Sequence, residues 1–363
     1  MIKNKNSRLR LIAPLTALVG AMILPTQSQA LIFELNDIGG AGVGSNARAG
    51  FDAAANIWSS LLQDDFTVRL DIGFSALGAG ILGSTSSAFQ VLSYTDTRTA
   101  LNNDATSTSD AQAVANLQTG PSLAVVTNPS SPGKVDTTKL VLDNDGSANN
   151  RFLAITRANA KAIGFADTGA SDANITFSSS FNFDFNQNDG IASDSFDFIG
   201  VAIHEIGHVL GFSSGVDIYD VFGSPNGPSA GNLGKNDLNN FAVANILDLF
   251  RYQEGNLDWS VGGNPLFSID GGITDIAPFS SGRFNGDGQQ ASHWQDNLGL
   301  GILDPTFGFG EFGQITPLDI LAFDVIGYDL RQAAIPEPHV FGLALLGFLA
   351  MGSTMRKRQT QRN

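Results

Sequence analysis

The residues best suited to chemistry are two histidines and a glutamate within HEIGHVLGF, residues 204–212. His204 and His208 are four residues apart, so on a helix they lie one turn apart on the same face and can bind a single metal ion. Neutral imidazole is a good ligand for zinc. Glu205 lies on the adjoining face, where it would not bind the ion but could take a proton from an activated water. The segment therefore predicts a zinc-dependent peptidase.

The residues around this motif predict the helix that must position it. Apolar residues recur at helical spacing from Phe196 to Leu210, so the motif is expected on a half-buried helix. Gly211 follows the last apolar turn and can adopt the left-handed conformation that ends a helix. The alternative explanation is a buried helix whose histidines only make hydrogen bonds.

A catalytic zinc ion usually has three protein ligands and a water, so a third ligand is needed. The chain has four histidines, and His339 lies in the C-terminal tail. The remaining one is His293, 85 residues beyond His208. Asp217 and Asp220 follow the helix closely and are alternative carboxylate ligands. If His293 is not a ligand, its segment is an ordinary loop packed on the domain.

These motifs resemble the leishmanolysin-like branch of the metzincin metallopeptidases, which has His-Glu-x-x-His-x-x-Gly-Phe, a long insertion and a third histidine before a tryptophan. Segments 204–212, 291–294 and roughly 301–328 carry the resemblance. It implies zinc ligation by three histidines and a general-base role for one glutamate: His204, His208 and His293, with Glu205. The short metzincin pattern would have a histidine where this chain has Ser214. Leu303 stands where the family's turn beneath the metal has a methionine of similar volume.

The N-terminal 30 residues have the three parts of a secretory signal. Basic residues precede the apolar stretch 11–24, and Ser28-Gln29-Ala30 supplies the small residues that a signal peptidase accepts. The sequence predicts cleavage after Ala30, with an uncleaved anchor as the alternative.

The C-terminal segment 335–363 resembles the PEP-CTERM sorting signal of Gram-negative bacteria. Pro336-Glu337-Pro338 is followed by an apolar stretch, 340–351, and by basic residues at 356–358. The resemblance implies cleavage by an exosortase after a transient pause in the inner membrane, and then a cell-surface, extracellular-matrix or secreted location. A plain membrane anchor is the alternative, but the apolar stretch is shorter than the roughly 20 residues preferred for a permanent span.

The composition is that of an acidic, exported globular protein. Removing both end segments from the 20 basic and 35 acidic residues leaves 12 and 34, a formal charge of −22. Such a surface repels nucleic acid and anionic lipid, so neither is an expected partner. The chain has no cysteine, which excludes disulfides and thiolate metal sites. A protein or peptide substrate is the expected partner.

The sequence predicts an α+β fold with two lobes between the end segments: an N-terminal catalytic lobe, 31–215, and an insertion with a C-terminal lobe, 216–334. The resemblance implies a twisted mixed sheet in the first lobe and a largely irregular second lobe with a closing helix. The periodicity predicts helices and strands, long loops and edge segments over about 80–150, and helical spacing at 238–249. The predicted elements are a helix at 47–62, a strand at 66–74, a strand from 175 to 185 and the closing helix at 315–328.

The sequence leaves alternatives open for calcium binding, for the oxyanion donor and for the function. The acidic loops 143–146 and 184–190 have oxygen ligands spaced as in Ca²⁺ loops, but neither has the closing glutamate, and solvated Asx turns are the favoured explanation. Tyr328 or a backbone amide could stabilise an oxyanion. Two other functions fit the same motifs: an inactive metallopeptidase-like scaffold in the extracellular matrix, and a zinc hydrolase acting on a non-peptide bond.

Overall fold

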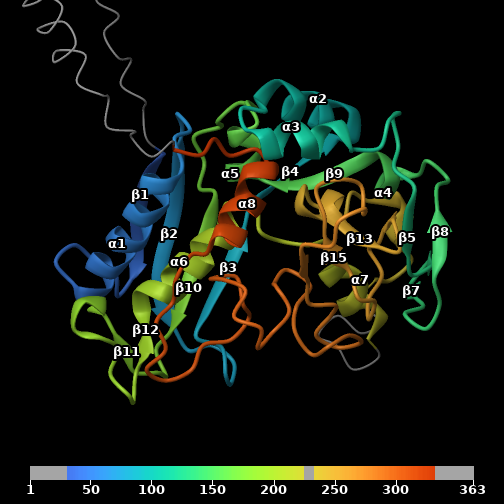
Figure 1. Ribbon diagram of the computed structural model, residues 1–363. Coiled ribbons are helices and arrows are strands. Elements are labelled where there is room, and N and C mark those ends of the chain that lie inside the picture. The colour runs from blue at the N-terminus through green and yellow to red at the C-terminus, as the bar shows by residue number, and fades with distance from the viewer. Residues whose placement is uncertain (1–30, 225–232, 332–363) are drawn as a thin grey trace, which may run out of the picture.

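A computed structural model describes residues 31–224 and 233–331 of the 363-residue chain (Figure 1). The predicted signal peptide, 1–30, and the predicted sorting signal, 335–363, lie outside the described residues and stay predictions. Among the residues that the structure does describe, no helix is long and apolar enough to cross a membrane. Helices and several separate sheets occur together, so the predicted α+β class is confirmed.

The first half of the chain is built on a four-stranded mixed sheet of order β1-β2-β10-β3. Three strands are parallel, and β3 pairs antiparallel with β10 at one edge. Two helices, α1 and α6, pack against each other beside this sheet. The bounds are β1 Ile32–Gly39, β2 Thr67–Ser75, β3 Gly83–Ser87, β10 Ala173–Ser178, α1 Asn46–Leu61 and α6 Phe198–Val209. The predicted helix at 47–62 and strand at 66–74 are therefore confirmed to within a residue, as α1 and β2, whereas β1 before them was not predicted.

The predicted strand from 175 to 185 is interrupted. β10 ends at Ser178, where the Ser178 hydroxyl accepts a hydrogen bond from the Ser180 amide and the chain turns. A second short strand, β11 (Phe183–Asp184), then pairs with β12 (Phe196–Asp197), directly before α6. The alternating phenylalanines that suggested one strand instead fill an aromatic cluster, in which Phe183 and Phe177 both contact Phe198.

The prediction of long loops over 80–150 is wrong for 94–115, which forms α2 (Tyr94–Asp104) and α3 (Thr108–Ala115). The polar residues that suggested loops cap these helices. Ser93 accepts from the Asp96 amide, and Ser107 forms a reciprocal capping box with Asp110. The other elements of the first half are β4 Phe89–Ser93, β5 Val125–Thr127, β6 Ser130–Ser131, β7 Lys134–Val135, β8 Val141–Asp143, α4 Ala148–Arg151, β9 Phe152–Thr156, α5 Arg157–Ala162 and η1 Gln187–Asp189.

The second half contains α7 (Val216–Gly223) and a small antiparallel sheet of order β14-β13-β15-β16. The predicted helical spacing at 238–249 gives only two short 3₁₀ turns. Asp248 explains the difference, because its buried carboxylate accepts from the Asn245 and Gly215 amides and so competes with helical hydrogen bonding. The bounds are η2 Leu238–Asn240, η3 Leu247–Phe250, β13 Arg251–Gln253, β14 Asn256–Leu257, β15 Leu266–Phe267 and β16 Ala277–Pro278.

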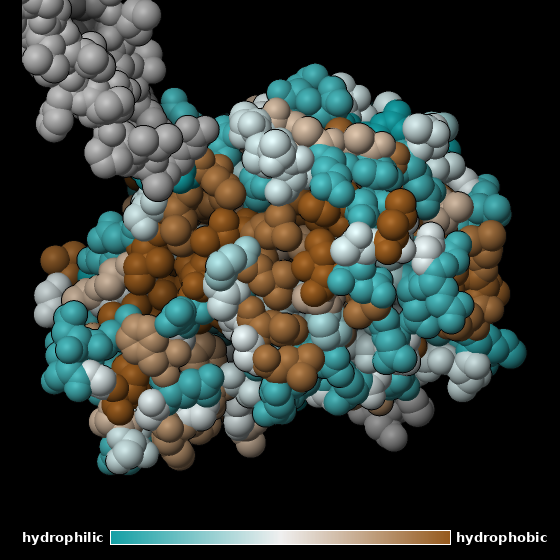
Figure 2. All heavy atoms as spheres, in the orientation of Figure 1, coloured by the Kyte–Doolittle hydropathy of each residue, from teal (hydrophilic) through white to brown (hydrophobic). Residues whose placement is uncertain are grey.

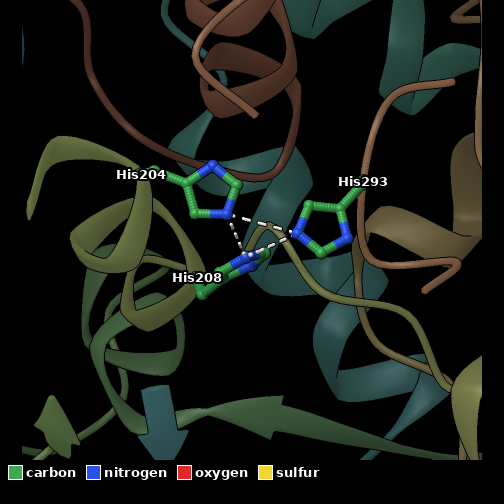
Figure 3. Close-up of side chains that lie close together, drawn as sticks. All are labelled: His204, His208 and His293. Carbon is green, nitrogen blue, oxygen red and sulfur yellow. Dashed lines mark hydrogen bonds between the residues drawn. The ribbon is translucent and has the colours of Figure 1, made fainter. Parts of the chain in front are cut away.

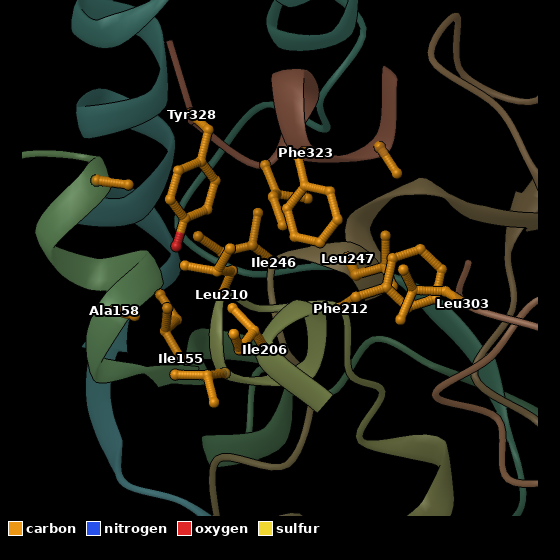
Figure 4. Packing of buried hydrophobic residues seen from close by; sticks show 14 of the residues in the cluster. Ile155, Ala158, Ile206, Leu210, Phe212, Ile246, Leu247, Leu303, Phe323 and Tyr328 are labelled. Atoms are coloured by element: carbon orange, nitrogen blue, oxygen red, sulfur yellow. The ribbon is translucent and has the colours of Figure 1, made fainter. Parts of the chain in front are cut away.

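The predicted closing helix is present as α8 (Pro317–Val325), capped by Thr316. It lies between the two halves of the fold (Figure 1) and packs Phe323 against the Trp58 ring of α1, with ring centroids 4.6 Å apart. Figure 4 shows Ile206 and Leu210 on the side of α6 that faces Phe323. Apolar residues also gather on the surface over this part of the molecule, surrounded by hydrophilic ones (Figure 2). The helix that carries the HEIGH motif is thus held from several sides.

A group of carboxyl side chains lies where α8 meets the ends of α1 and α2. Asp64 is 8% exposed, and the carboxylates of Asp329 and Asp104 are near enough to repel a charge on it. Burial, followed by repulsion from Asp329, raises the pKa of Asp64 from 3.8 to about 8. Because the folded state binds the proton more tightly than the unfolded chain does, the contribution of Asp64 to stability is complete below pH 3.8 and is lost as the pH rises toward 8.

We expect Asp64→Asn to unfold like the wild type below about pH 3.8 and to be more stable than it by more than about 1 kcal/mol at about pH 8.5. The amide has the shape of the neutral acid and never acquires its buried charge. Urea unfolding of both proteins over this pH range, at equal metal content, measures the difference. A difference that stays constant with pH would contradict the assignment to Asp64.

Candidate metal centre

The helix α6 that carries the motif is buried on almost every side. The Trp58 indole donates to the Ile203 carbonyl over 3.0 Å, which fixes the helix against α1. Gly207 packs closely against Leu303, since a Cβ there would lie 3.2 Å from both Cδ atoms of Leu303. Gly211 has φ +115° directly after the helix, as the sequence predicted for the residue that ends it.

The structure brings together the three histidines that the sequence singled out (Figure 3). Their Nε2 atoms are 3.0 Å apart for His204 and His208, and 3.2 Å from each of these to His293. A tetrahedral zinc ion with nitrogen ligands at about 2.0–2.1 Å requires nitrogens about 3.3–3.4 Å apart. The triangle therefore has nearly the size that one metal ion needs, and the group could hold one.

The other ring nitrogens set the orientation of the three imidazoles. Nδ1 of His204 lies 2.7 Å from the Ile302 carbonyl, and Nδ1 of His208 lies 2.7 Å from the Phe212 carbonyl. Nδ1 of His293 is 3.2 Å from the Gln290 carbonyl. Since a carbonyl only accepts, each Nδ1 carries the proton, and each Nε2 presents its lone pair to the other two.

Three lone pairs that face one another repel unless a cation lies between them. Burial lowers the pKa of all three histidines, to about 3 for His204, so that they are neutral and have the form that binds metals. Backbone carbonyls on the far ring nitrogen are the usual outer partners of metal-binding histidines. The donor set thus fits a metal ion better than it fits a hydrogen-bonded histidine cluster.

Asp217, considered above as an alternative ligand, holds the His293 loop instead. One carboxylate oxygen accepts from the Ala291 amide at 2.7 Å, and the other accepts from the Ser292 amide at 3.2 Å and the Ser292 hydroxyl at 2.5 Å. Arg251, which is fully buried, donates to the Ala291 carbonyl from the other side. The two residues before His293 are therefore fixed at both their amides and at a carbonyl.

Asp220, the second alternative ligand, is also occupied elsewhere. It is 1% exposed and accepts from the Phe284 and Asn285 amides, each at 2.8 Å, and from the Asn285 side chain. Neither aspartate is part of the histidine group. Among residues 31–224 and 233–331, no other set of three His, Asp or Glu side chains brings its ligand atoms as close together.

The segment 301–303 supports the site from below and is held by Asp319 of α8. Asp319 accepts from the Ile302 amide and from the Trp294 indole, both at 2.9 Å. Asp319 thereby links Ile302, whose carbonyl orients His204, to Trp294, which directly follows His293. Leu303 is fully buried, and its two Cδ atoms lie against Gly207, the residue before His208.

Glu205 is buried beside the edge strand β3. Its Oε2 accepts from the Thr85 hydroxyl at 2.7 Å, and a Cβ at Gly83 would lie 2.6 Å from Oε1. Burial raises the pKa of Glu205 to about 7, and the Thr85 hydrogen bond opposes this rise. The carboxylate is thus fixed next to the histidines and has a basicity suited to moving a proton near neutral pH.

These residues open on a cleft of about 790 Å³. Two stretches, 79–89 and 283–293, provide most of its lining, and all three histidines and Glu205 reach it. Tyr328, named above as an oxyanion donor, is fully buried in the core and is not part of the lining (Figure 4). In the acidic loops, Asp145 and Asp184 each accept from the backbone amide two residues further on, Ser147 and Asn186, as in Asx turns.

Sequence reasoning did not identify Thr85, Asp217 as a support, or Asp319. The pattern Thr316-x-x-Asp319 is a capping box and could have indicated that Asp319 has a structural role. Thr85 has no such signal, because it is 120 residues away from Glu205 in the chain.

Comparison with family models, with curated proteins and with solved structures gives no match for this chain.

Proposed function

We propose that this protein is an exported zinc-dependent endopeptidase with Glu205 as the general base. The observation that supports this most strongly is the triangle of three imidazole nitrogens, 3.0–3.2 Å apart, beside a buried carboxylate in an open cleft. Three neutral nitrogen ligands with no thiolate suit zinc in a catalytic rather than a closed structural site. The predicted leader and sorting signal support action at the cell surface, in the matrix or in the medium.

Zinc, when bound, would act as a Lewis acid that polarises a carbonyl and makes water more acidic. His204, His208 and His293 would hold it. Glu205 would accept a proton from the attacking water and then deliver it to the departing amine nitrogen. The Thr85 hydroxyl would keep the Glu205 carboxylate turned toward the cleft during both transfers.

Strand β3 is the best candidate for binding the substrate backbone. It is the edge strand of its sheet, and its residues line the cleft from Gly83 to Ser87. All five are Gly, Ser or Thr, which leave the backbone accessible. An extended peptide that pairs with this edge would pass beside Glu205 by the general mode of strand addition.

The test is zinc stoichiometry together with casein or gelatin hydrolysis by the purified protein. We expect one zinc per chain, with hydrolysis that a chelator abolishes and added zinc restores. A protein that takes up no zinc would contradict the proposal and favour the scaffold function. A zinc protein that cleaves simple esters and no peptide would contradict the endopeptidase assignment and favour another hydrolase.

A further inference from the structure

The cleft is nearly free of charged side chains, with one exception on the wall that carries His293. Among its described lining residues only Glu205 and Arg283 carry a formal charge, since the three histidines are neutral. The rest of the lining is Gly, Ala, Ser, Thr, Gln, Pro and aliphatic or aromatic residues. The whole chain has a formal charge of −15, so the positive charge of Arg283 in this cleft is opposite in sign to the net charge of the protein.

The loop that presents Arg283 is rigidly built. Asp220 accepts from the amides of the next two residues, Phe284 and Asn285, both at 2.8 Å. The Gly282 carbonyl, on the other side of Arg283, accepts from the Gly286 and Gly288 amides at 3.1 and 3.0 Å. The backbone on both sides of Arg283 is thus fixed by the protein, while its exposed side chain lines the cleft.

The Arg283 guanidinium has no carboxylate within salt-bridge distance in the part of the chain that the structure describes. Arg48, Arg69 and Arg251 each have an aspartate or glutamate within 4.0 Å, whereas Arg283 is among the described arginines that have none. The one described contact of Arg283 is with the Phe284 ring, at 5.9 Å from its centroid. Its donors therefore remain available to a ligand in the cleft.

We propose that Arg283 determines specificity by binding a carboxylate of the substrate, and that this carboxylate is the side chain of an Asp or Glu close to the cleaved bond. The inference rests on the proposed endopeptidase function. A guanidinium is suited to a carboxylate because its N–H groups match the two oxygens in a planar, charge-assisted pair. The acidic surface outside the cleft does not prevent this, since physiological salt screens charges beyond about 8 Å.

The test uses fluorogenic peptides that differ at one position at a time, with Glu, Gln or Lys on either side of the cleaved bond. We expect kcat/KM for the Glu peptide to exceed that for the Gln peptide by about tenfold at one position, because one charge-assisted pair is gained there. Arg283→Gln should remove this preference, and Arg283→Glu should shift it toward the Lys peptide. Zinc content should not change in either variant.

Arg151→Gln is the matched control. Arg151 is also an exposed arginine that lies over the ring of the following phenylalanine, at 5.4 Å, but it does not line the cleft. It should retain the full preference for Glu. A wild-type protein that cleaves the Glu and Gln peptides equally, or a preference that survives in Arg283→Gln, would overturn the inference.

A carboxylate could also come from the peptide's C-terminus, so each peptide is made with a free and an amidated end. A preference that follows the free terminus rather than the internal Glu would overturn the side-chain assignment. Failure of the proposed function is distinguishable, because no peptide would then be cleaved. In that case, peptide affinity is measured with Arg283→Gln and the wild type, and equal affinity for the Glu and Gln peptides in both would overturn the inference independently of catalysis.

Discussion

Glu205→Gln is expected to lower kcat for peptide hydrolysis by about 10²–10⁴-fold while the protein still binds one zinc ion, because general acid–base catalysis typically contributes a factor of this size. The amide keeps the shape of the side chain, and its oxygen can still accept from the Thr85 hydroxyl. What it lacks is the ability to take up a proton. Parallel kinetics and metal analysis of the wild type and the variant measure both properties.

Glu254→Gln is the matched control, since Glu254 is exposed and does not line the cleft. It should hydrolyse peptides at the wild-type rate. Activity within about threefold of wild type in Glu205→Gln would remove Glu205 from the general-base role, because that loss is too small for an essential proton transfer. Loss of zinc together with activity would also contradict the assignment, because Glu205 would then support the metal rather than the proton transfer.

The sequence was most informative where the chemistry is local. His204, Glu205 and His208 lie within one helical segment, so their spacing and the apolar residues around them were enough to predict the helix, its end at Gly211 and the side on which the histidines lie. His293 was selected because the chain has few histidines, and the structure then places its Nε2 3.2 Å from both others. The identity of the metal and the reaction remain predictions.

The parts that were not predicted depend on contacts between distant segments or on residues with two plausible roles. Thr85 reaches Glu205 only because β3 lies beside α6. Asp217 had the right chemistry for a ligand, and only the fold directs its oxygens to the Ala291 and Ser292 amides. Serines are common in loops and at helix N-termini alike, so composition favoured loops where Ser93 and Ser107 in fact begin helices.

His293→Ala is expected to weaken zinc binding by at least about 100-fold, since two histidines hold a catalytic zinc poorly and even outer partners of the ligands account for 10–100-fold. At equal free zinc, a 100-fold weaker site gives up about 2.7 kcal/mol of the stability that the ion adds to the folded state. Competition with a chromogenic chelator measures the affinity, and thermal unfolding with and without zinc measures the stabilisation.

Gln290→Ala is the control for this loop, because Gln290 also lines the cleft but contributes only its backbone carbonyl to His293. It should bind zinc as tightly as the wild type does. Wild-type affinity in His293→Ala would mean that the third ligand lies elsewhere. Asp217 could take that role only by releasing the Ala291 and Ser292 amides and the Ser292 hydroxyl. Such an exchange would leave the two amides and the hydroxyl without their carboxylate acceptor, so the geometry of the loop itself favours His293 as the ligand.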